Sequence, residues 1–295
     1  MTFAEKLKAV RRQAGMSQEK LAEKLGVSRQ AVTKWETEGG IPDVDNLKAI
    51  SALFDISIDE LLSNGRGAKF MSDYLYESVV EYDIDEPKRY DLKLGGAKRI
   101  VVSGYDGEKF RVRLASNALS GLQSDFKVKI DDIRGRIDVG VDRKGGVTEA
   151  EAKRELDIFV QLPAPYIRRV ELAAHAETVE AHTLKCDDIE FDIKAPNAVL
   201  EDVAGKVEID CNLDMNVICR TLEGEVAINQ VSSNSRICVP EGLAFRAIRK
   251  GIGTGISYEK DGKPAEAFDA TGAENIIELN GLKSELIIST FAKEG

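Results

Sequence analysis

The sequence predicts a multidomain α + β protein, in which an all-α domain of five helices precedes a larger all-β domain. Three observations predict this organisation. Apolar residues recur at helical spacing as far as residue 62, a short polar stretch at 63–68 contains two glycines, and apolar and polar residues alternate beyond it. The predicted boundaries are 1–64 for the helical domain, 65–75 for the linker and 76–295 for the β domain. A length of 295 residues fits two domains.

The first three helices are predicted from an apolar stripe and its interruptions. A helix over 3–13 places Phe3, Leu7 and Val10 on one face. Residues 17–36, SQEKLAEKLGVSRQAVTKWE, then read as two short helices joined by a tight turn at Gly26 and Val27, where Ser28 can cap the second. Their apolar stripe is predicted to be core, Trp35 included, and consists of Leu21, Ala22, Leu25, Val32 and Trp35.

The second of these short helices carries a group of polar side chains directly after its cap. Arg29, Gln30, Thr33 and Lys34 follow Ser28. A helix that enters the major groove needs this arrangement, because Arg or Lys can donate to guanine and Gln can pair with adenine. The alternative is a solvated polar helix face that binds nothing. We favour the first interpretation and predict a DNA-reading helix.

Matching residues extend over the whole first domain. They are Arg11-Arg12, Gly15-Met16-Ser17-Gln18, Leu21-Ala22, Gly26-Val27-Ser28, Ala31-Val32, Trp35-Glu36, Ile41-Pro42-Asp43, Leu47, Ile50, Leu53-Phe54 and Leu61-Leu62. On these residues, 1–63 resembles the DNA-binding domain of the XRE/Cro/C1 family, the helix-turn-helix class of phage repressors. The resemblance implies a sequence-specific regulator of transcription, and more specifically a repressor.

The resemblance also implies roles for individual residues. Family members have an ion pair between the first helix and the end of the third, which here falls on Arg11 and Glu36. Arg12 lies on another face and is predicted to meet a phosphate. Gln18 follows the cap of the second helix, where family members clamp the DNA backbone through an amide and a helix N-terminus. The predicted DNA-binding residues are therefore Arg12, Gln18, Ser28, Arg29, Gln30, Thr33 and Lys34.

The end of the first domain carries another helix signal. Residues 57–60, Ser-Ile-Asp-Glu, match a capping box, so a fifth helix is predicted to start at residue 58. Its Ile58, Leu61 and Leu62 would pack back on the first and fourth helices.

The charge of the chain lies mostly in the second domain. Residues 1–64 hold 9 Lys and Arg against 10 Asp and Glu, whereas residues 65–295 hold 32 against 41. An acidic β domain should repel DNA, so one helical domain is expected to bind modestly. We therefore predict a homodimer on a two-fold operator in double-stranded DNA.

The β domain is predicted from alternating runs between turn signals. Arg99–Ser103 and Lys109–Leu114 read as a hairpin around Asp106-Gly107, and a second hairpin is predicted around Arg134-Gly135 from Phe126–Ile130 and Ile133–Val141. The polar stretch 143–154 is predicted as a loop with some helix. Strands resume at 156–162 and break at Pro163 and Pro165. Three tyrosines after the linker are predicted to form a dimer contact or to cover the domain's end: Tyr74, Tyr76 and Tyr82.

An internal repeat sets the architecture of this domain. Val203, Gly205, Val207 and Ile209 recur 19 residues later as Leu222, Gly224, Val226 and Ile228. The same spacing relates Val199, Ile218 and Ile237, and also Cys219 and Cys238; Leu184 falls in register with Val203. Alternation at this period predicts a β-solenoid with glycines at the corners, and the alternative is a β-sandwich. Residues 90–290 resemble DUF4097-type adhesin-like domains, through repeats such as GKVEID and GEVAIN.

The cysteines and histidines give no strong site. No Cys pair has zinc-ligand spacing, and no metal is predicted. Cys219 and Cys238 would lie about 4.8 Å apart on adjacent coils, within reach of a disulfide; in a reducing compartment they would instead be small buried fillers. His175 and His182 could sense pH or bind a metal, but isolated packed or surface histidines are more common.

The leading prediction is a cytoplasmic DNA-binding regulator without a cofactor, whose β domain oligomerises or senses a small-molecule or protein effector. Residues 1–15 are charged and do not resemble a signal peptide, and no apolar run reaches the ~18 residues of a membrane span. The alternative is an antitoxin-like interaction module, whose DNA binding depends on a protein partner. Asp187, Asp188 and Asp192 are close enough to suggest polysaccharide cleavage, but no nucleophile or phosphate-binding motif accompanies them, so no catalytic residue and no enzyme is predicted.

Overall fold

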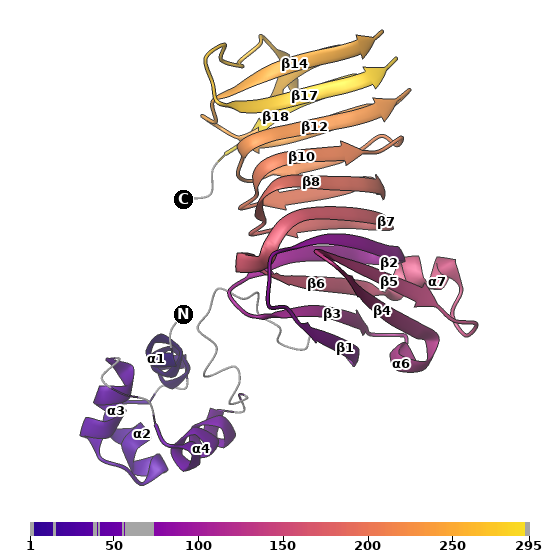
Figure 1. The fold of residues 1–295 in the computed structure, drawn as a ribbon. Coiled ribbons are helices and arrows are strands. Elements are labelled where there is room, and N and C mark those ends of the chain that lie inside the picture. Colours follow the sequence, from indigo (N-terminus) through magenta and orange to yellow (C-terminus); the bar gives the residue numbers. More distant parts are fainter. Residues whose placement is uncertain are drawn as a thin grey trace. The chain divides into compact units, whose positions relative to one another are not determined.

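The computed structural model describes residues 3–13, 16–37, 40, 42–54, 56 and 74–292. These residues fall into two compact units, one helical and one built of strands (Figure 1). The predicted linker start and the predicted fifth helix, with Ile58, Leu61 and Leu62, lie outside the described residues. Within the described part of the chain, no helix is long and apolar enough to cross a membrane.

Side-chain caps set the boundaries of the helical unit. Ser17 Oγ accepts a hydrogen bond from the backbone N–H of Lys20, and Ser28 Oγ accepts one from that of Ala31, each at 3.1 Å. Gly26 ends the second helix at φ +68°, a left-handed conformation that glycine adopts without a Cβ penalty. The described helices are α1 (Phe3–Gln13), α2 (Gln18–Leu25), α3 (Arg29–Glu36) and α4 (Val44–Phe54).

One apolar cluster holds the four helices together. Leu7, Leu21, Val32 and Ile50 are fully buried, one from each helix, and Trp35 is buried beside them. Trp35 is therefore a core residue, as its spacing predicted. Because the helices share this small core, the orientation of α3 depends on all of its partners.

The second unit has two stacks of parallel strands that pass from coil to coil (Figure 1). One stack runs β5-β2-β7-β8-β10-β12-β17-β14, and the other runs β6-β2-β7-β9-β11-β13-β18-β15; β2 and β7 contribute to both. The strands are β1 (Tyr76–Asp83), β2 (Lys88–Tyr105), β3 (Lys109–Ser116), β4 (Phe126–Ile133), β5 (Arg136–Arg143), β6 (Asp157–Pro163), β7 (Ile167–His182), β8 (Lys185–Lys194), β9 (Asn197–Glu201), β10 (Ala204–Asp210), β11 (Asn216–Cys219), β12 (Glu223–Val231), β13 (Asn234–Pro240), β14 (Phe245–Ile252), β15 (Gly255–Lys260), β16 (Lys263–Ala265), β17 (Asn275–Leu282) and β18 (Glu285–Phe291).

Alternation along each strand builds the core between the two stacks. In β10, Val207 and Ile209 are buried while their sequence neighbours are not. The equivalent pairs in β12 and β17, Val226 with Ile228 and Ile277 with Leu279, are buried too, and there the intervening Ala227 and Glu278 are also buried. Short helical segments connect some strands: α6 (Leu122–Asp125), α7 (Glu149–Glu155) and the 3₁₀ turn η1 (Ala164–Tyr166). Helix α7 lies in the stretch predicted as a loop with some helix, and Thr148 and Glu151 form its capping box.

The register of the repeat agrees with the prediction between β10 and β12, which form its first column. Gly205 pairs with Gly224, Val207 with Val226 and Ile209 with Ile228. The glycines sit at φ +116° and +123°, where an added Cβ would collide with the carbonyl oxygen of the preceding coil. They are therefore required by the close approach of successive coils, and the β-solenoid expectation is confirmed.

The second column of the repeat, formed by β11 and β13, departs from the predicted register by one residue. Val217 pairs with Ile237 and Ile218 with Cys238, so the 19-residue register expected for Ile218 with Ile237 is wrong. The path from β12 to β13 carries one residue more than the path from β10 to β11. A one-residue slip turns a side chain to the other face of its sheet. Cys219 is accordingly buried while Cys238 is half-buried, the shared column expected for this pair is wrong, and all four cysteines are free.

Only one of the two predicted hairpins forms. The pair β4 and β5 is antiparallel around Gly135, as expected. The hairpin around Asp106-Gly107 is wrong: the turn reverses the chain, but β6 occupies the place between the two strands and pairs parallel with β2 and antiparallel with β3. The edge strand β1 then pairs antiparallel with β3. A local turn signal contains no information about β6, which lies some 50 residues later in the sequence.

The last coil is inserted into the stack. Strands β17 and β18 lie between β12–β13 and β14–β15, so the coil that comes last in sequence is not last in space. Near the other end, Tyr74 packs its ring on Phe159 at 5.9 Å between centroids and donates its hydroxyl to Asp157. Tyr74 thereby covers a small apolar cluster of Val101, Ala115 and Phe159.

Candidate nucleic-acid interface

Helix α3 presents one continuous polar face. Arg29, Gln30, Thr33 and Lys34 are all exposed, and their spacing of one and four residues places them side by side on the helix. The opposite face buries Val32, Trp35 and Glu36 in the unit. The helix is thus held by one face and free to contact another molecule with the other.

The start of α3 is fixed by Ser28. Its side chain is used as the helix cap, and its φ of −75° and ψ of 150° are those of an extended capping residue. Ser28 is also exposed, at the same end of the helix as Arg29 and Gln30. Its first role in this structure is therefore to hold the helix end at which these two side chains lie.

Gln18 connects α2 to α3. Its amide nitrogen donates to Glu36 Oε2 at 2.8 Å, and its amide oxygen lies 3.2 Å from Thr33 Oγ1. The Thr33 hydroxyl is also 3.0 Å from the carbonyl oxygen of Arg29, and its single proton can serve only one of these acceptors at a time. The Gln18 amide is largely engaged inside the unit, so any phosphate contact at this point would come mainly from the backbone at the start of α2.

The ion pair expected between Arg11 and Glu36 is present and bidentate. Arg11 Nε donates to Glu36 Oε1 at 2.6 Å, and one of its terminal nitrogens donates to Oε2 at 2.9 Å. Burial alone would raise the pKa of Glu36, but hydrogen bonds from Arg11 and Gln18 and the charge of Arg11 outweigh it and lower this pKa. Arg11 also donates to the carbonyl oxygen of Met16, so one side chain fixes α1, the turn before α2 and the end of α3.

The structure therefore separates the residues expected at the interface into two groups. Arg12, Arg29, Gln30 and Lys34 are exposed and take part in no ion pair within the described residues. Gln18 and Thr33 make a hydrogen bond that joins α2 to α3, and Ser28 accepts the hydrogen bond that caps α3. The sequence analysis missed the hydrogen bonds that join Gln18 to Thr33 and Glu36. These partners lie 15 and 18 positions after Gln18 on another helix, and such a separation gives no periodic signal.

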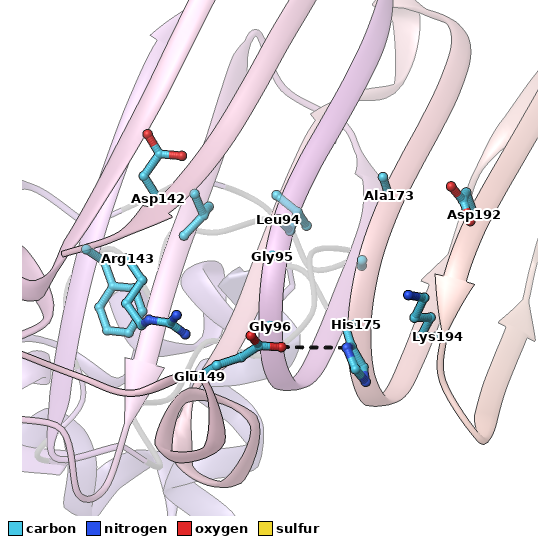
Figure 2. A pocket seen from close by; sticks show the side chains of 13 residues that line it. Leu94, Gly95, Gly96, Asp142, Arg143, Glu149, Ala173, His175, Asp192 and Lys194 are labelled. Atoms are coloured by element: carbon cyan, nitrogen blue, oxygen red, sulfur yellow. Dashed lines mark ion pairs between the residues drawn. The ribbon is translucent and has the colours of Figure 1, made fainter. Parts of the chain in front are cut away.

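A second candidate site, also missed in the sequence, is a groove of about 680 Å³ in the β unit. Figure 2 shows Gly95 and Gly96 of β2 between Arg143 on one side and His175 and Lys194 on the other. The small residues at this corner leave room that larger side chains would fill. Two of the carboxylates that line the groove are paired, Asp142 with Lys129 and Glu149 with Lys153. Arg143, Lys194 and Asp192 form no ion pair within the described part of the chain, so the groove keeps two positive charges and one negative charge.

His175 is engaged within this groove. Its Nε2 lies 3.0 Å from Lys153 Nζ, and its Nδ1 lies 3.7 Å from Glu149 Oε1. Burial, and then the charge of Lys153, lower the pKa of His175, which favours the neutral imidazole. The other histidine, His182, contacts Glu180 at 2.9 Å and Glu201 at 3.3 Å.

Comparison with known proteins relates the helical unit to helix-turn-helix regulators. The family model described as Helix-turn-helix matches residues 7–61. The HTH-type transcriptional activator BcrR of Enterococcus faecalis is 51% identical over 63 residues, which cover 21% of this chain and 31% of that protein. The HTH-type transcriptional regulator ImmR of Bacillus subtilis (strain 168) is 31% identical over 94 residues, covering 32% of this chain and 74% of that protein. This chain thus spans about a third of the length of BcrR.

The β unit has a weaker likeness to solved structures. A candidate cell adhesion protein from Clostridium sporogenes covers 73% of this chain and 99% of its own, with 13% sequence identity and a TM-score of 0.36. Similarity at this level gives no information about what the β unit binds.

Proposed function

The chain belongs to the XRE-type helix-turn-helix family of transcriptional regulators, and from this premise we propose that it binds a two-fold DNA operator as a dimer and represses transcription. The observation that carries the proposal is the exposed face of α3, where Arg29, Gln30, Thr33 and Lys34 follow a capped helix start. In this class of domain the start of the second helix of the helix-turn-helix motif, here α3, reaches base edges in the major groove.

Each side chain on this face has a chemical role. Arg29 suits the two acceptors of guanine, and Gln30 suits the donor and acceptor of adenine. Lys34 and Arg12 supply positive charge for phosphates, which fix orientation without reading sequence. Two copies of α3 would meet successive major grooves about 34 Å apart on one face of the duplex.

We expect Arg29→Ala and Gln30→Ala each to weaken specific binding by about 1–3 kcal/mol, or roughly 5- to 150-fold in Kd. Each removes base contacts from an exposed position, so the fold should be unchanged. The measurement is a salt-titrated binding assay of the full chain, with its own promoter DNA and a scrambled duplex.

The matched control for these variants is Lys48→Ala on α4, an exposed cation of the same unit that lies outside the proposed interface. It should leave specific binding within twofold of the unchanged chain. Unchanged operator affinity in both Arg29→Ala and Gln30→Ala would contradict the assignment of α3 as the reading helix.

The sign of regulation has two sources of support that disagree. The resemblance to phage repressors favours repression, whereas the relative BcrR is named an activator. A promoter–reporter fusion compared with and without this chain measures the sign directly. Higher reporter output without the chain supports repression, and lower output supports activation.

We further propose that the β unit oligomerises or senses an effector. The groove beside Gly95 and Gly96 favours an anionic effector, because Arg143 and Lys194 stand at its two sides without ion pairs among the described residues and only one carboxylate of its lining, Asp192, is likewise unpaired. A protein effector would instead use the outer faces of the sheet stacks. Retention of operator binding when Arg143 and Lys194 are changed to alanine, together with loss of the effector response, would support the groove.

A second candidate function is a partner-dependent DNA binder of the antitoxin kind. The observation that favours it is the acidity of residues 65–295, which hold 41 Asp and Glu against 32 Lys and Arg and should oppose DNA binding. If the purified chain binds weakly and ignores sequence, while a co-purifying protein restores selective binding, this second function replaces the first.

A further inference from the structure

Four large apolar side chains lie exposed along one corner of the β unit. They are Leu213, Val231, Leu282 and Ile252, with exposed fractions of 43%, 50%, 43% and 76%. We name these four residues the corner ridge. A contiguous row of exposed apolar groups is unusual on a soluble surface and marks a site of interaction more often than scattered exposed residues do.

The strand register makes this row continuous. Leu282 of β17 pairs with Val231 of β12 on one side and with Ile252 of β14 on the other, so the three side chains leave the sheet on the same face. Leu213, after β10, lines one groove of about 430 Å³ together with Val231 and Leu282. The ridge therefore runs from the turn after β10 across the ends of β12, β17 and β14.

Charge changes sign along the same corner. Asp192 of β8 and Asp210 of β10 lie at one end, where Lys194 of β8 also lines the groove, and Lys283 and Lys250 lie at the other, beside Leu282 and Ile252. Between them the register continues through Asn229 and Asn280, which are neutral. Asp210 and Lys283 form no ion pair within the described residues, whereas Lys250 contacts Glu278 at 2.7 Å.

We propose that the corner ridge is where two copies of this chain meet, with a two-fold axis at Val231. This inference rests on the dimer of the proposed function and gives it a surface. Val231 belongs to β12, the middle strand of β8, β10, β12, β17 and β14. A two-fold axis there places β10 of one copy against β17 of its partner, and β8 against β14.

This arrangement matches both kinds of side chain. Val231 meets its own copy, and Leu213 meets Leu282 of the partner subunit, so apolar groups cover each other at the centre. Asp192 then lies level with the partner's Lys250, and Asp210 lies level with the partner's Asn280, three residues before the partner's Lys283, which is the first cation after β17. A two-fold interface is self-complementary, so each of these contacts occurs twice. The acidic end and the basic end of one ridge thus satisfy each other across the axis.

The interface is small. Five neighbouring strands span about 19 Å at ordinary sheet spacing, which is less than a standard interface of about 1,600 Å² needs. We therefore expect a dimer that dissociates in the micromolar range in the absence of DNA. An operator with two half-sites raises the effective concentration of the second copy and would stabilise the dimer on DNA.

Charge reversal across the axis tests the arrangement. Sedimentation equilibrium of the full chain measures its dimer Kd, and Asp210→Lys or Lys283→Asp alone should raise that Kd at least tenfold through like-charge contacts. The double variant Asp210→Lys/Lys283→Asp exchanges the two signs and should return the Kd to within about threefold of the original. Glu266→Lys, an exposed site away from the ridge with the same charge change as Asp210→Lys, is the control and should have no effect.

Three outcomes would overturn the proposal. They are a chain that stays monomeric at all concentrations, single variants that dimerise normally, and a double variant that remains as weak as the singles. Circular dichroism melting of each variant separates loss of the interface from loss of the fold. A monomeric chain that still binds its operator selectively would refute the ridge alone, whereas a dimer that follows the charge-reversal pattern but ignores operator sequence would refute the proposed function alone.

Discussion

Replacing Arg11 with methionine should unfold the helical unit and abolish operator binding while the β unit remains folded. The guanidinium makes two hydrogen bonds to the carboxylate of Glu36 and one to the carbonyl oxygen of Met16, and both charged side chains are buried. Removing one partner of a buried ion pair typically costs about 3–5 kcal/mol, since the other charge is left without compensation. A domain below about 70 residues rarely holds more than about 3–5 kcal/mol in total.

Thermal unfolding of the full chain checks this expectation. The variant should lose the α-helical circular dichroism signal at a temperature where the β signal is retained. Arg12→Ala is the matched control, because the neighbouring Arg12 is exposed and outside every ion pair of the described residues. It should change the free energy of unfolding by less than about 0.5 kcal/mol, as surface substitutions do. Equal stability of both variants would show that the Arg11–Glu36 pair does not hold the unit together.

The same ion pair gives the helical unit a defined pH dependence. The pKa of Glu36 is lower in the folded chain than in the unfolded chain, so the folded state binds fewer protons in this range. The stabilisation is therefore complete above the ordinary carboxyl pKa of about 4.3 and is lost as the pH falls through the lower folded value. The difference in stability between the unchanged chain and Arg11→Met should narrow below about pH 4. A constant difference from pH 7 to pH 3 would contradict the role given to Glu36.

Replacing Gly205 with alanine should be the most damaging small substitution in the β unit. Gly205 has φ +116°, and an added Cβ would collide with the backbone carbonyl oxygen of Cys186 on the preceding coil. Backbone strain of this kind costs about 1–3 kcal/mol, and overpacking against a rigid neighbour adds about 1–3 kcal/mol. We expect a total of at least about 3 kcal/mol, which lowers the Tm of a unit of this size by roughly 6–12 °C.

Gly145→Ala provides the comparison for this substitution. An added Cβ at Gly145 meets no atom within 4 Å, and its φ is not in the left-handed region. The Tm of the β unit should stay within about 2 °C of the original. Gly224→Ala, which meets the carbonyl oxygen of Gly205, should behave like Gly205→Ala. If all three variants melted together, close contact between coils would not explain the glycines of the repeat.

Much of the candidate interface could be predicted from the sequence, because its signals are local. Two serines cap α2 and α3, Gly26 ends α2, and the polar residues of α3 follow the cap directly. A cap and its helix lie within a few residues of each other, so the sequence itself contains the whole interaction. The placement of Trp35 in the core follows in the same way from helical spacing.

The first column of the solenoid was also predictable, since repetition at one period carries long-range register into the sequence. Gly205 with Gly224 and Val207 with Val226 are neighbours in space because they are equivalent in the repeat. The prediction failed where the period changed. One additional residue before β13 moved Cys238 next to Ile218, and no local signal marks such an insertion.

The sequence by itself determined the type of each unit, the cap and polar face of α3 and the glycine corners, all of which depend on spacing along the chain. The tertiary structure alone decided that β6 separates β2 from β3, that β17 and β18 enter the stack before β14 and β15, and that Gln18 joins Glu36 to Thr33. The corner ridge depends on the same insertion, because Leu282 lies between Val231 and Ile252 only through it. These contacts join distant segments through packing and hydrogen bonding, whose partners a one-dimensional pattern does not specify.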